Sequence, residues 1–151
     1  MIVQIAAAFV GSIGFAIFFK MKGKQIWLAG LGGAVTWAVY LVAQEYMVDL
    51  FMPYFIASIF VGVYAEIMAR VNRAPATIFL TAAAVPLIPG GSLYYTMAGL
   101  VNKDEVLFSQ SGSSAITIAL AISMGFVVVA IVTKYFYLIK ASGFFSKGSK
   151  K

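Results

Sequence analysis

Cysteine and histidine are both absent from this chain of 151 residues. Their absence excludes disulfides, Cys/His zinc sites, haem held by either residue and acid–base catalysis by histidine. The sequence also contains no nucleotide-binding loop, no paired catalytic carboxylates and no plausible metal cluster. We therefore expect no cofactor, no metal and no enzymatic activity, and we do not expect ATP-driven transport by this chain alone.

Charged residues are scarce as well, because they make up only 11% of the chain, compared with about 25% in soluble domains. Hydrophobic residues make up 62%, and the mean hydropathy is +0.97. This composition predicts a multi-pass protein of the cell membrane, surrounded by the lipid bilayer. The net charge of +6 is explained by basic loops on the cytoplasmic side, and nucleic acid is not an expected partner.

The apolar segments predict an all-α integral membrane protein with about five transmembrane helices. A span needs about 20 apolar residues. We expect residues 1–140 to form a single transmembrane domain and residues 141–151 to form a basic cytoplasmic tail. The loop at 103–112 reads as polar. The expected spans are residues 2–19, 26–43, 50–69, the two halves 75–87 and 91–101 of a broken fourth helix, and 113–133.

The loop charges predict the orientation. The loops after the first and third spans and the C-terminal tail are basic, whereas the loops after the second and fourth spans are mostly acidic. With five crossings, this pattern places the N-terminus outside and the C-terminus inside. If the fourth segment were a re-entrant hairpin instead, the tail with its five lysines would lie outside. A cysteine placed in the tail and labelled from either side distinguishes the two arrangements.

The stretch from residue 77 to residue 102 is apolar enough to cross a bilayer, but VPLIPGG interrupts its middle. Proline removes a helical N–H and glycine disfavours a straight helix. Transporter sites are often built from such broken helices, because a half-helix that begins inside the membrane offers free N–H groups to a carboxylate. The other interpretation is a kink that serves packing. The candidate substrate-binding residues are Pro86, Pro89, Gly90, Gly91, Ser92, Tyr94 and Tyr95.

Glu66 is the only acidic residue within an apolar span, and Arg70 follows it by one helical turn. An intramembrane carboxylate is a candidate for carrying a proton. The spacing also suits an interfacial ion pair on one helix face, which we favour. Trp37 lies deep in the second span, where packing is its expected role.

The run from Glu66 to Tyr95 reads E-x3-R-x4-PATIFL-x5-PLIPGGSLYY. It resembles the small-subunit half of the threonine/serine exporter (ThrE-like) family, in which an acid and an arginine precede a Pro-Ala-Thr run and then P-L-(I/V)-P-G-G followed by tyrosine. The size and the small-residue-rich helices agree over nearly the whole chain, although the specific resemblance lies in this run.

The resemblance implies a small subunit of a secondary exporter, working with a larger membrane subunit of the same family. Its implied substrates are small carboxylate-bearing solutes: threonine and serine, or dicarboxylates such as succinate in a related branch. The alternative is a non-transporting accessory or scaffold subunit that docks the larger partner. The resemblance provides no catalytic residues to transfer to this chain.

Overall fold

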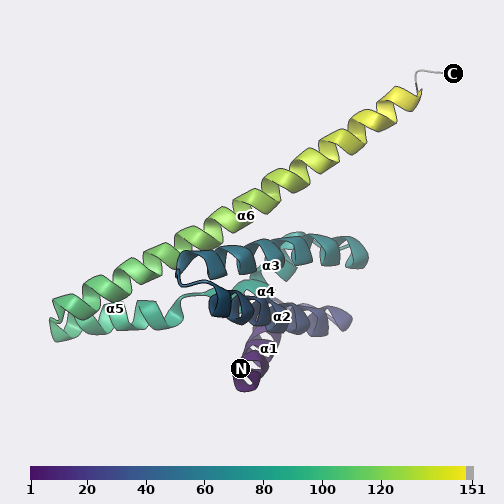
Figure 1. The fold of residues 1–151 in the computed structure, drawn as a ribbon. Coiled ribbons are helices and arrows are strands. Elements are labelled where there is room, and N and C mark those ends of the chain that lie inside the picture. The colour runs from purple at the N-terminus through teal and green to yellow at the C-terminus, as the bar shows by residue number, and fades with distance from the viewer. Residues whose placement is uncertain (149–151) are drawn as a thin grey trace.

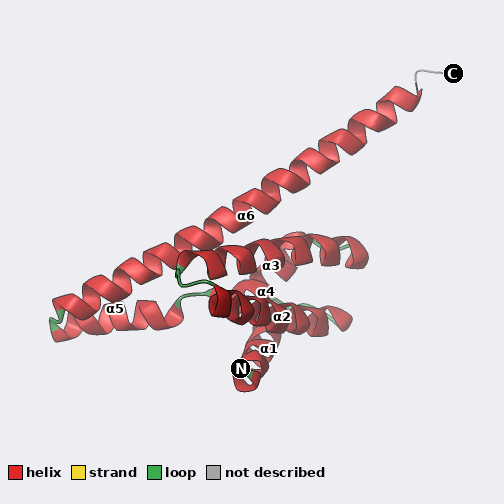
Figure 2. Cartoon of the chain, viewed as in Figure 1, coloured by secondary structure: helices red, strands yellow, loops and turns green. Residues whose placement is uncertain are grey.

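Every regular element within residues 1–148, the part of the chain that the computed structural model describes, is a helix (Figure 2). The α2 and α3 helices and the part of α6 up to Ile139 are long and apolar enough to cross a membrane. The broken segment passes the same test as a bent pair, whereas α1 is shorter, with 17 residues. The elements are α1 (Ile2–Phe18), α2 (Lys24–Tyr46), α3 (Phe51–Asn72), α4 (Ala76–Ala84), the 3-10 turn η1 (Val85–Leu87), α5 (Gly90–Asn102) and α6 (Glu105–Gly148).

The all-helical prediction is confirmed, and the first three expected spans and both halves of the fourth agree with the helices to within three residues. The number of crossings and the orientation stay predictions. The expected loop at 103–112 was wrong, and the helix that contains the fifth expected span is longer than that span. The α6 helix has 44 residues, includes most of the expected loop at 103–112, and continues past residue 133 through Gly148. The last three residues of the expected tail lie outside the described residues.

A helix cap explains the early start of α6. Asp104 accepts a hydrogen bond through Oδ1 from the Leu107 N–H at 3.0 Å, which satisfies one of the free donors in the first turn. Glu105 follows in that turn, where the helix dipole favours an acid. Lys103 closes α5 with a left-handed φ of 56°. The first residues of the expected loop are therefore the caps of a tight α5–α6 turn, and the rest of it belongs to α6.

Small residues allow the helices to approach closely. The inner residues of α2, α3 and α4 are mostly alanine and glycine, with Phe79 and Leu87 as the largest apolar side chains that are completely buried. Gly33 of α2 faces Ser12 of α1, and a Cβ at residue 33 would collide with the serine Oγ. Such backbone-to-backbone packing replaces the hydrophobic driving force, which is weak between helices in lipid.

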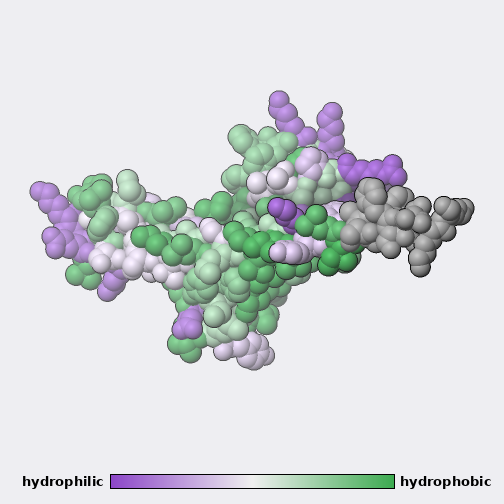
Figure 3. Space-filling view, turned by 90° about the horizontal axis from the view of Figure 1, so that it is seen from above, coloured by the Kyte–Doolittle hydropathy of each residue, from purple (hydrophilic) through white to green (hydrophobic). Residues whose placement is uncertain are grey.

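The α5 helix leaves the bundle (Figure 1). It makes extensive contact only with α6, antiparallel to the first part of that helix, while the middle of α6 packs along α3. Large apolar side chains cover much of the outside of the molecule, and hydrophilic residues gather at the α5–α6 turn (Figure 3). This distribution suits a chain embedded in lipid, and it leaves the outer face of α5 open.

Candidate functional site

The chain breaks between α4 and α5, as VPLIPGG predicts. Pro86 lies in η1, and Pro89 is the N-cap of α5. Ile88 between them is extended, with a ψ of 127°, because the residue before a proline avoids the helical region. The two helical pieces meet at a bend of 56°.

The first turn of α5 has unused donors. The Gly90 N–H donates to the Ile88 carbonyl at 2.7 Å, and the Leu93 N–H donates to the Pro89 carbonyl at 3.0 Å. The N–H groups of Gly91 and Ser92 have no acceptor within residues 1–148, and no side chain caps this helix. A Cβ on Gly90 or Gly91 would meet nothing within 4 Å. The positive end of α5 therefore faces open space.

The structure separates the predicted binding residues into two groups. Pro86 alone lines a cavity, whereas the residues from Pro89 to Tyr95 lie around the open first turns of α5 and line none of the cavities described here. Tyr94 and Tyr95 are 69% and 54% exposed and contact each other edge to face, with ring centroids 5.4 Å apart. Within the described residues, the α5 group is therefore open on its outer side.

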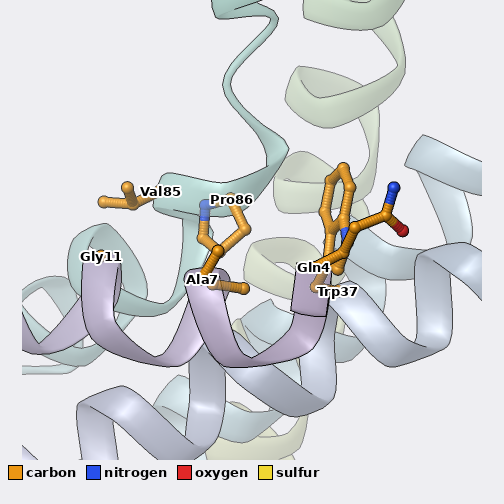
Figure 4. Close-up of a pocket in the computed structure, with 7 residues that line it drawn as sticks. Gln4, Ala7, Gly11, Trp37, Val85 and Pro86 are labelled. Atoms are coloured by element: carbon orange, nitrogen blue, oxygen red, sulfur yellow. The ribbon is translucent and has the colours of Figure 1, made fainter. Parts of the chain in front are cut away.

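The cavity beside Pro86 lies between α1, α2 and η1 and has a volume of about 310 Å³ (Figure 4). The sequence predicts a packing role for Trp37 and indicates no cavity at this part of α1. Small residues on two successive turns of α1 were the available signal, because such a face either packs tightly or leaves space. The lining residues are Gln4, Ala7, Ala8, Gly11, Trp37, Val85 and Pro86.

Glu66 and Arg70 lie apart from this cavity. Arg70 Nη2 is 3.6 Å from Glu66 Oε2, and the arginine guanidinium lies 4.9 Å from the centroid of the Tyr137 ring on α6. The Glu66 side chain is 31% exposed and the Arg70 side chain is 47% exposed. The ion pair therefore adds little stability in water. Glu66 also lines a small cavity between α3, α4 and α6. The structure therefore connects the ion pair to the α3–α6 contact, not to the break.

Comparison with known families gives a match over most of the chain. The model of the family described as "Threonine/Serine exporter, ThrE" matches residues 4–132. This range contains nearly all of α1, the whole of α2 to α5, the break, the cavity and the first 28 residues of α6. No solved structure matches the chain. Since the match covers most of its length, this chain belongs to the threonine/serine exporter family.

Proposed function

We propose that this chain is the small subunit of a secondary exporter for small carboxylate-bearing solutes, with its solute site at the break between α4 and α5. Threonine and serine are the leading candidates, and succinate is the dicarboxylate to test beside them. The exporter-type role rests on the family. The observation that supports this site is the pair of unused N–H groups on Gly91 and Ser92, in a chain as apolar as this one.

An unpaired N–H costs several kcal/mol in lipid, so a membrane protein must satisfy it. A carboxylate suits the N-terminus of a helix, because it accepts hydrogen bonds and its charge complements the dipole. In this proposal the N–H groups of Gly91 and Ser92 hold the carboxylate, Gly90 lines the site beside them, and Pro86 and Pro89 maintain the bend. The hydroxyls of Tyr94 and Tyr95 lie on the open side, where a partner can complete the site.

The partner in this proposal is the larger membrane subunit of the same family, docked along α5. The assembly lies in the cell membrane, and this chain crosses it five times with its C-terminus inside. The proton gradient provides the energy. Glu66 has two possible roles, as the carboxylate that carries the proton or as the ion-pair partner of Arg70.

The exposed apolar face of α5 also supports the alternative of a non-transporting scaffold subunit. In that case the face docks the partner, and the break serves packing. The two functions differ in what a change at the break affects: solute transport in the first, assembly in the second.

Solute efflux from preloaded cells tests the proposed function. Cells loaded with threonine, serine and succinate would express this chain alone, the larger subunit alone, or both. We expect efflux of threonine and serine only on co-expression, because α5 presents half of a site. Efflux from this chain alone would contradict the two-subunit proposal. If neither combination exports any of the three solutes, although both chains are in the membrane, the scaffold function is favoured.

A further inference from the structure

The indole N–H of Trp37 is a buried donor without an acceptor. Its Nε1 atom is shielded from solvent, and no hydrogen-bond partner lies within reach among residues 1–148. Trp37 stacks on Tyr40, with ring centroids 4.7 Å apart, so the indole is held in place by its face. Buried donors are nearly always paired, and an unpaired one is a reason to look for a missing acceptor.

The missing acceptor has a place to bind. Trp37 lines the cavity of about 310 Å³ beside Pro86, which is at the lower end of the range for small-molecule sites. Gln4 lines the same cavity from α1 (Figure 4). Its side chain is exposed, and its amide makes no hydrogen bond within the described residues. Because no hydrogen bond holds the Gln4 amide, it is free to orient toward a molecule bound beside Trp37.

The residues that line the cavity favour a ligand with a hydroxyl group over one with a carboxylate. Apart from Trp37 and Gln4, the cavity is lined by alanine, glycine, valine and proline, and no charged side chain is among the lining residues. A carboxylate would lose its hydration there without a counter-charge. A hydroxyl group fits better, because it can accept from an indole N–H and donate to an amide oxygen at the same time.

We propose that this cavity binds the side-chain end of a small hydroxy amino acid. Trp37 Nε1 donates to the hydroxyl oxygen, and the Gln4 amide oxygen accepts the hydroxyl proton. Ala7 and Ala8 contact the remaining apolar part of the side chain. This inference rests on the proposed function and adds to it a second contact site, separate from the α5 N-terminus, at which Trp37 and Gln4 distinguish threonine and serine from alanine and from succinate.

Tryptophan fluorescence tests binding without transport. The chain has two tryptophans, Trp27 and Trp37, so Trp27→Phe leaves Trp37 as the only reporter and Trp37→Phe leaves Trp27. In the purified full chain we expect threonine and serine to change Trp37 emission saturably, while alanine and succinate have much weaker effects. Trp27 lies at the exposed start of α2, and its emission should not respond. An equal response of Trp37 to alanine, or no response to threonine, would overturn the inference.

Efflux separates this inference from the proposed function. Loss of one hydrogen bond predicts a rise in the threonine KM of about fivefold to tenfold in Trp37→Phe, with Trp27→Phe at the wild-type value. Gln4→Leu should show the same rise in the threonine KM. This second variant provides the test if Trp37→Phe does not accumulate. Wild-type KM in both variants of an active exporter would refute the hydroxyl site and leave the exporter intact. A Trp37 response to threonine without any wild-type efflux would support the hydroxyl site and refute the exporter.

Discussion

Gly125→Leu is expected to eliminate the folded protein. Gly125 lies on α6 where that helix crosses α3, and a Cβ at this residue would collide with the Ser58 Oγ and approach the Phe55 carbonyl oxygen to 3.1 Å. Ser58 cannot simply turn away, because its hydroxyl donates to that same carbonyl at 2.7 Å. Overpacking by added methylenes costs about 1–3 kcal/mol in a core that can adjust. Here the contact is close to backbone, and we expect the loss to be at or above the upper end of that range.

The amount of folded protein after detergent extraction measures this effect. Gly14→Leu is the matched control, because a Cβ on Gly14 of α1 would meet nothing within 4 Å; it should accumulate like the wild type. A milder Gly125→Ala variant should have a lower melting temperature, and Ser58→Gly in the same chain should restore part of the loss by removing the colliding atoms. If Gly125→Leu accumulates at the wild-type level, the α3–α6 packing described here is wrong.

Gly91→Leu is expected to leave folding unchanged and to lower solute efflux by about 100-fold, the loss typical of a misplaced substrate. A Cβ on Gly91 would meet nothing within 4 Å, and the residue does not have a positive φ, so the chain itself tolerates a side chain there. The leucine would instead occupy the space in front of the free N–H groups of Gly91 and Ser92. The solute carboxylate would then be excluded from the α5 N-terminus.

Efflux is compared at equal amounts of the assembled exporter, and Gly14→Leu again provides the control. The scaffold alternative predicts the opposite result. In that case Gly91→Leu reduces co-purification of the larger subunit, and the complexes that remain transport solute at the wild-type rate. Normal assembly together with wild-type efflux would remove the α5 N-terminus from the solute site.

The sequence predicts the helices well, because their determinants are local. Long apolar runs place α1, α2 and α3, and Pro86 and Pro89 place the break. The error in α6 was also local, since Asp104 and Glu105 have the composition of a loop although Asp104 is the N-cap of α6 and Glu105 begins its first turn. A cap and a loop have the same composition, and only the downstream helix distinguishes them.

The candidate site was only partly predictable, because it depends on how helices meet. The proline and glycine pattern identifies a bend but not its direction, so the departure of α5 from the bundle could not be foreseen. The face of α1 at Ala7 and Gly11 could equally have packed tightly, as Ser12 does on Gly33. Whether Trp37 finds an acceptor is likewise a tertiary property that no spacing in α2 encodes.

In the proposed exporter, the N-terminus of α5 faces a solute in a water-accessible site. The chain lacks cysteine, so Gly91→Cys introduces its only thiol, at a position where a Cβ meets nothing within 4 Å. The measurement is the rate of modification by a small, membrane-impermeant thiol reagent in membranes that contain both subunits, with and without threonine. We predict modification that threonine slows, with Gly14→Cys unreactive in the lipid. A Gly91→Cys thiol that is unreactive, or that reacts at the same rate with saturating threonine, serine or succinate, would contradict the claim.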